Sequence, residues 1–271
     1  MERANGVSRT ILERFGDYAR GRISPAVVVG LLCPLLVGSF VVAVALAASS
    51  YPKPFDVRLQ WISSLASAKQ NPLGFFYMGS GLTAVALLLI PIPGYLGRGP
   101  HASAASHRAG ATLLWIGIAA LLLLGIETTA FPNYGRGRGI HRILSVITLA
   151  TLTLGFATLT LSRSLAAVRS WRRVWLACSV LLAPAVGAGL TGVLLHLGPD
   201  APGWAIARQD KRDAPFYRTL AFWEWAAVTG LFAGGSLCVW AVSPGRASLP
   251  RPETASAGSV DSARGHSPTA G

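Results

Sequence analysis

The chain has 271 residues, of which 52% are hydrophobic and only 13% carry a formal charge. Soluble globular proteins carry about 25% charged residues, so this composition excludes an ordinary soluble domain, a disordered chain and a collagen-like chain. The formal net charge is +13, but the basic residues lie between long apolar stretches, where they orient membrane proteins. We therefore predict an integral membrane protein with no nucleic-acid partner.

The N-terminal segment, residues 1–25, is predicted to lie in the cytoplasm. Within it, Ile11, Phe15 and Tyr18 recur near helical spacing among charged residues. This spacing is typical of a short amphipathic helix that lies in the membrane interface. We expect such a helix over residues 8–22.

Six apolar stretches reach the length of about 20 helical residues that crosses a bilayer. They cover residues 26–48, 74–94, 111–131, 143–162, 174–197 and 219–242. The predicted fold class is therefore all-α, a six-helix transmembrane bundle over residues 26–242. Residues 243–271 are rich in Ser, Ala, Gly and Pro, so we expect a disordered cytoplasmic tail.

The distribution of basic residues predicts the orientation of the bundle. Of the 24 Lys and Arg residues, 14 fall in segments on the side of the N-terminus and 10 in the loops on the other side. Positive charge accumulates on the cytoplasmic side, so both termini are expected in the cytoplasm. Cys33, Cys178 and Cys238 all lie inside apolar stretches and are interpreted as small core residues.

Ionisable side chains inside membrane spans cost free energy and need an explanation. Glu127 lies in the third span and Glu224 in the sixth, while His141 opens the fourth span and His196 closes the fifth. The topology places all four near the extracytoplasmic face, and we call them the polar layer. Ser63 joins this layer if residues 57–66 form a short re-entrant or interfacial helix.

Each of these residues also has a simpler interpretation. The two carboxylates can pair with loop arginines, and the histidines can lie among lipid headgroups. The arginines in question are Arg136, Arg138 and Arg218. Trp223 and Trp225 fit an interfacial aromatic belt, Ser63 fits a helix cap, and His101 and His107 are expected to be solvated in a cytoplasmic loop.

Small residues recur at four-residue spacing in two spans and predict close helix contacts. They are Ala183, Gly187 and Thr191 in the fifth span, and Ala226, Gly230 and Gly234 in the sixth. Packing within the bundle is the preferred interpretation. Contact with a second copy or another membrane protein is the alternative.

Two short motifs resemble a known family. Ser63-Ser-Leu-Ala with Asn71-Pro72, and Phe131-Pro-Asn followed by His141, resemble the bacterial six-span membrane family called domain of unknown function 998. Trp61-Ile-Ser-Ser and Phe222-Trp-Glu-Trp are more weakly similar to six-span DRAM-type and GPI-anchor-remodelling proteins. The resemblance implies the six-span fold and a bacterial cytoplasmic membrane, and implies an activity less strongly.

Three functions and one minor alternative are considered for this chain, and whether it is an enzyme stays open. The preferred hypothesis is a protein that binds a lipid or a membrane partner through Glu127, His141, His196 and Glu224. The second is an intramembrane lipid hydrolase or transferase, in which these residues hold zinc or supply a base and Ser63 is a candidate nucleophile. A transporter is disfavoured because midplane charge is missing, and haem bound by His141 and His196 is a minor alternative.

Overall fold

A computed structural model describes residues 11–57, 60–131, 138–167, 171–197 and 220–243. These residues are mostly helical and contain no strand, which confirms the all-α prediction. Six helices are long and apolar enough to cross a membrane. The predicted tail over 243–271 lies outside the described residues except for Ser243.

The first span is built from three consecutive helical segments. They are α2 (Pro25–Val27), the π-helical η1 (Val28–Leu32) and α3 (Cys33–Ser49). Ser24 caps the start, where its Oγ accepts a hydrogen bond from the Val27 N–H at 3.3 Å. The π-helical turn ends two residues before Pro34, whose ring and missing N–H disfavour the regular hydrogen-bond pattern of an α-helix.

The second span is interrupted near its end, before Pro91 and Pro93. Helix α5 (Phe75–Leu89) ends before Pro91, and α6 (Pro91–Leu96) follows. A proline donates no hydrogen bond to the carbonyl four residues earlier, so the Leu87 carbonyl lacks its usual partner. The Tyr18 hydroxyl donates to this carbonyl at 3.2 Å and so ties the N-terminal segment to the bundle.

The remaining spans are four long helices. They are α7 (Ala104–Ala130), α8 (Arg138–Ala167), α9 (Trp171–Leu197) and α11 (Leu220–Val242). The first of these begins seven residues before the predicted span 111–131, because Ser103 caps it and accepts a hydrogen bond from the Ser106 N–H at 3.0 Å. Polar residues at this end therefore continue the helix beyond its apolar part.

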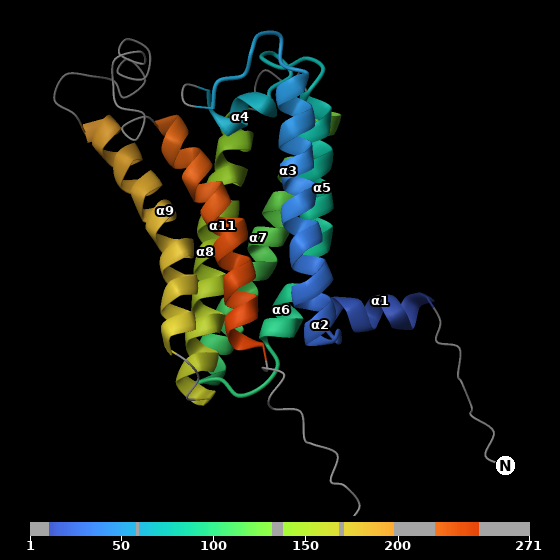
Figure 1. The fold of residues 1–271 in the computed structure, drawn as a ribbon, viewed down its shortest axis with the longest axis vertical. Helices are drawn as coiled ribbons and strands as arrows, with labels where there is room; N and C mark the ends of the chain where they lie inside the picture. Colours follow the sequence, from blue (N-terminus) through green and yellow to red (C-terminus); the bar gives the residue numbers. More distant parts are fainter. Residues whose placement is uncertain (1–10, 58–59, 132–137, 168–170, 198–219, 244–271) are drawn as a thin grey trace, which may run out of the picture.

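Neighbours in the bundle follow the order of the chain for most of its length. Helix α3 packs on α5, α5 on α7, and α7 on α8, while α11 packs mainly on α9 and also on α8. Figure 1 shows these helices side by side, with α4 (Ile62–Leu65) at one end and α6 at the other. We call these the α4 end and the α6 end.

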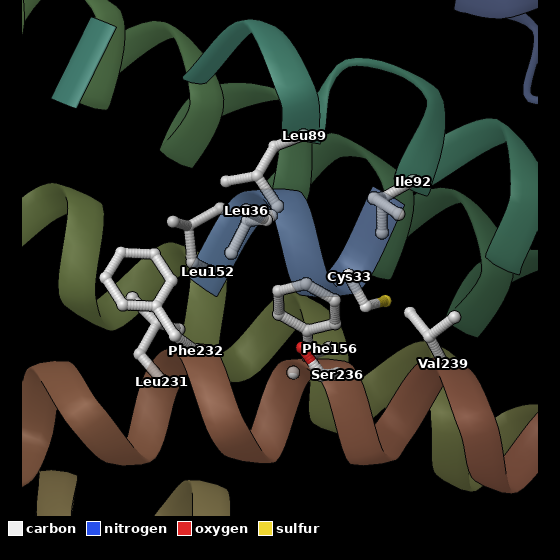
Figure 2. Close-up of a pocket in the computed structure, with 11 residues that line it drawn as sticks. Cys33, Leu36, Leu89, Ile92, Leu152, Phe156, Leu231, Phe232, Ser236 and Val239 are labelled. Carbon is white, nitrogen blue, oxygen red and sulfur yellow. The ribbon is translucent and has the colours of Figure 1, made fainter. Parts of the chain in front are cut away.

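The middle of the bundle is mainly apolar, with the buried threonines Thr148 and Thr153 of α8 as polar exceptions. Phe40 and Phe232 meet there with ring centroids 4.6 Å apart. A small cavity lies among α3, α5, α6, α8 and α11 and has about 10 Å³ of space for water. Figure 2 shows the side chains that line it. Its lining side chains are mostly aliphatic or aromatic, and this volume is roughly that of one water position. Cys33, Cys178 and Cys238 are buried and free, as predicted.

The small-residue stripes pack inside the chain. A side chain added at Gly230 would meet the Pro184 ring at 2.8 Å and the Val180 carbonyl at 2.9 Å. At Gly234 it would meet the Leu181 backbone, and at Gly187 the Trp223 ring. Helix α9 therefore covers Gly230 and Gly234 of α11, and α11 covers Gly187 of α9. Ala183 is exposed and the Thr191 side chain lies outside the described residues, so packing within the bundle accounts for these three glycines.

Candidate functional site at the α4 end

The helix ends place the predicted polar layer at one end of the bundle. Glu127 lies in the last turn of α7, His141 in the first turn of α8 and Glu224 in the first turn of α11. His196 is in the last turn of α9, but its side chain lies outside the described part of the chain. All these helix ends are at the α4 end in Figure 1.

Glu127 and His141 form a direct pair. The His141 Nδ1 lies 3.0 Å from the Glu127 Oε2, and the two side chains are 23% and 22% exposed. A carboxylate that accepts from Nδ1–H fixes the ring orientation and leaves Nε2 to bind a proton, a metal or a ligand. The structure thus gives Glu127 a histidine partner. Among its predicted arginine partners, Arg136 lies outside the described residues.

Glu224 meets the short helix α4, and this brings Ser63 into the site. The carboxylate lies beside the Ser63 hydroxyl and the backbone N–H groups of Ile62 and Ser63, all of which are oriented as donors toward it. Its Oε2 atom is buried and has no hydrogen-bond partner among the described residues. Ser63 therefore reaches the polar layer, as expected if residues 57–66 contain a short helix. Arg218, the predicted partner of Glu224, lies outside the described residues.

Aromatic contacts hold the loop that carries α4 against α11. The Trp225 Nε1–H donates to the Gln60 carbonyl at 3.0 Å, and its ring packs edge-on against Phe55 with centroids 6.1 Å apart. Phe55 in turn packs against Tyr51 at 5.3 Å. The loop therefore covers part of the Trp225 indole and accepts its hydrogen bond, while the interfacial aromatic belt stays a prediction. Trp223 packs at Gly187.

Asn71 fixes the other end of this loop, and its structural role was missed in the sequence. Its side chain is fully buried. The Nδ2 donates to the Ala47 carbonyl at 2.8 Å and to the Leu65 carbonyl at 3.3 Å, while Oδ1 accepts from the Gly74 N–H at 3.1 Å. One amide therefore satisfies backbone groups at the end of α3, the end of α4 and the start of α5. The Asn71-Pro72 pair was visible in the sequence, but its partners were not.

The described residues bring the polar layer together as two separate pairs. One is Glu127 with His141, and the other is Ser63 with Glu224. Within the described ranges, no three His, Cys, Asp or Glu side chains converge on one point. A catalytic zinc ion takes three protein ligands, and the described pairs supply at most two at either position.

A second polar cluster lies at the α6 end, where solvated histidines were expected. The rings of His101 and His107 pack with centroids 4.5 Å apart, and the Nδ1 atom of each is buried without a hydrogen-bond partner in the described residues. His101 Nε2 lies 3.2 Å from the Gly97 carbonyl. The prediction of solvated side chains is therefore wrong, because the turn after α6 folds His101 onto α7.

This packing predicts that acid destabilises the fold through His101. Burial lowers the pKa of His101 below its ordinary value of 6.5, and the nearby charges of His107 and Arg163 also lower it, against the Gly97 hydrogen bond. An unfolded histidine takes up its proton as pH falls through about 6.5, before the folded one does. Stability should therefore rise with pH from the lowered pKa up to about 6.5.

The check is thermal unfolding in detergent at a series of pH values between 5 and 8. The midpoint temperature of unfolding of the wild-type protein should fall steadily as the pH is lowered below about 6.5. A His101→Gln variant should show a shallower loss, because it has no proton to take up at this position. Equal slopes for the two proteins would show that His101 does not link stability to pH.

Comparisons of the chain with known protein families, with curated proteins and with solved structures found no match.

Proposed function

We propose that this chain is a multi-pass protein of a bacterial cytoplasmic membrane that binds a lipid headgroup at the α4 end through Glu224 and Ser63. The distribution of Lys and Arg supports an orientation with both termini in the cytoplasm. The α4 end then faces the outer leaflet. Membership of the family called domain of unknown function 998 remains a prediction from short motifs.

The observation that carries this proposal is the unsatisfied oxygen of Glu224. A carboxylate offers about four acceptor positions on two oxygens, and one of these oxygens is buried without a partner in the described structure. A buried acceptor without a donor costs about 1–3 kcal/mol. A lipid headgroup that carries a hydroxyl or ammonium group would supply the missing donor.

The Glu127–His141 pair supports a polar ligand at the same depth. Both members belong to helix turns at the α4 end, and their side chains remain about one-fifth exposed. With Glu127 on Nδ1, the His141 Nε2 is the ring nitrogen that can meet a ligand. A phosphate or ester oxygen accepts from a protonated ring, whereas a hydroxyl or amine can donate to a neutral one.

Lipid binding fits the described residues better than the two alternatives. A transport path needs polar groups near the middle of the membrane, and the cavity there is lined mainly by apolar side chains. Metal-dependent hydrolysis needs a set of ligands, and the described side chains form no such set of three. The contact between Ser63 and Glu224 can hold a ligand as well as it can activate Ser63 as a nucleophile.

The test is the lipid content of detergent-purified protein, measured by mass spectrometry, for wild type and Glu224→Gln. The variant keeps the shape of the side chain but removes the charge, so we expect lipid affinity to fall about tenfold to hundredfold, as the 1.5–3 kcal/mol of a charged hydrogen bond implies. Ser63→Ala should lower the lipid content in the same direction.

The matched control is Asp56→Asn, which removes an exposed carboxylate from the same loop. It should retain the lipid content of wild type. Unchanged lipid in Glu224→Gln, with an unfolding midpoint like that of wild type, would overturn the proposal. An equal loss in Asp56→Asn would overturn it as well, because the effect would then be general.

A further inference from the structure

An open groove lies at the α6 end, between the N-terminal helix α1 (Ile11–Ala19) and the first span. Figure 1 shows α1 lying across the direction of the bundle helices, beside α2 and α6. The groove has a volume of about 500 Å³. It lies at the opposite end from Glu224 and does not depend on the proposed function.

The position of α1 against the bundle is fixed by several backbone contacts. Arg98 Nη2 donates to the Arg20 carbonyl at 3.3 Å, in addition to the Tyr18 bond to Leu87. Gly21 adopts a φ of +65°, and an added side chain there would meet the Gly94 backbone at 2.6 Å. The chain can turn from α1 into the first span at this point because glycine tolerates positive φ. The wall of the groove that α1 forms is therefore held in place by specific contacts with the bundle.

One wall of the groove is apolar and runs along the first span. Val27, Leu31 and Leu35 line it, and their side chains are 43%, 54% and 47% exposed. The three residues are four apart along the first span and line the same groove across its π-helical segment, so they form an apolar strip of at most about 12 Å at 1.5 Å per residue. Such a strip matches the upper part of a lipid acyl chain.

The other wall is polar and carries net positive charge. It is formed by Arg14, Asp17, Tyr18 and Arg22. Arg22 Nη1 donates to Asp17 Oδ1 at 3.4 Å, yet its side chain is 62% exposed. A guanidinium has five N–H donors, so most of the donors of Arg22 face the groove or solvent, and Arg14 is likewise exposed.

We infer that this groove binds one anionic phospholipid of the bilayer. Arg14 and Arg22 bind the phosphate, and Val27, Leu31 and Leu35 line the first part of an acyl chain. The two walls meet where an interfacial helix joins a membrane span, which is the depth at which a headgroup joins its acyl chains. Two arginines against one aspartate leave the positive charge that selects an anionic lipid.

The test is native mass spectrometry of the full chain in detergent, titrated with phosphatidylglycerol or phosphatidylcholine of identical acyl chains. Each basic residue near a membrane surface contributes about 1 kcal/mol toward anionic lipid. We therefore expect wild type to prefer phosphatidylglycerol, and Arg14→Gln/Arg22→Gln to lose this preference by about tenfold to thirtyfold. Arg14→Lys/Arg22→Lys should retain most of it.

Arg108→Gln is the matched control, because it removes an exposed arginine at the same end that does not line the groove. It should keep the preference, and so should Glu224→Gln, which separates this site from the one at the α4 end. Leu31→Asn should weaken binding of both lipids.

An unchanged preference in the double glutamine variant, or an equal loss in Arg108→Gln, would overturn the inference. Full displacement by equimolar inorganic phosphate, or occupation of the groove by a second copy of the chain, would overturn it too.

Discussion

Replacement of Asn71 by leucine is expected to destabilise the bundle by about 3–5 kcal/mol. The leucine leaves the Ala47 carbonyl and the Gly74 N–H buried without partners, and each of these groups costs about 1–3 kcal/mol. It also removes the hydrogen bond to the Leu65 carbonyl. Asn71 is fully buried and makes all three of these hydrogen bonds. Equilibrium unfolding in mixed micelles with a denaturing detergent measures the change. The variant should also retain less lipid at the proposed site of Glu224 and Ser63, because the Asn71 amide holds the loop that carries Ser63.

Two further variants separate the role of the amide from a general effect of the substitution. Asn71→Asp keeps the acceptor for Gly74 but places an oxygen against the Ala47 carbonyl, so it should be destabilised nearly as much as the leucine variant. Gln70→Leu changes the exposed neighbour in the same turn and should change stability by less than about 0.5 kcal/mol. Equal effects at positions 70 and 71 would contradict the role assigned to Asn71.

A valine at Gly125 is expected to be strongly disruptive, because Gly125 lies where α7 packs against α5. An added Cβ would meet the Thr83 hydroxyl, the Thr83 backbone nitrogen at 2.8 Å and the Gly79 carbonyl at 2.9 Å. Two of these three atoms belong to the backbone, which cannot move aside as a flexible side chain can. Overpacking typically costs about 1–3 kcal/mol, and we expect the upper end of that range or more.

The matched control for this prediction is Gly38→Val, the same substitution inside another membrane span. Gly38 has open space where a Cβ would lie, so its replacement should leave the unfolding midpoint close to that of wild type. The measurement is again unfolding in mixed micelles, with circular dichroism as the signal. Equal unfolding midpoints for Gly125→Val and wild type would show that α5 and α7 are not held together at this crossing.

The sequence determined the six spans, because hydropathy over about 20 residues reports directly whether a helix can lie in hydrocarbon. It also placed Glu127 and His141 in one layer, since consecutive spans are antiparallel neighbours, although the partners it predicted for Glu127 were loop arginines and the hydrogen bond to His141 came from the structure. The end of α7 and the start of α8 then lie at the same depth. Chain order and span length are therefore enough to place these two residues in one layer.

Hydropathy could not determine which side chains lie in the core. Leu35 is 47% exposed and its neighbour Leu36 only 4%, yet the two residues are chemically identical. Lipid tails are as apolar as the interior of the bundle, so both faces of a span carry the same kinds of residue. For this reason the small-residue stripes predicted close contacts but could not identify the helix that covers them.

The remaining features depend on how loops fold onto the bundle, which only the tertiary structure decides. Four features join separate segments of the chain whose separation follows no periodic pattern. They are the contact of Ser63 with Glu224, the three hydrogen bonds of Asn71, the packing of His101 on His107 and the groove beside α1. Their geometry follows from individual hydrogen bonds and packing contacts between distant residues. Periodicity reports only how residues within one helix lie relative to each other.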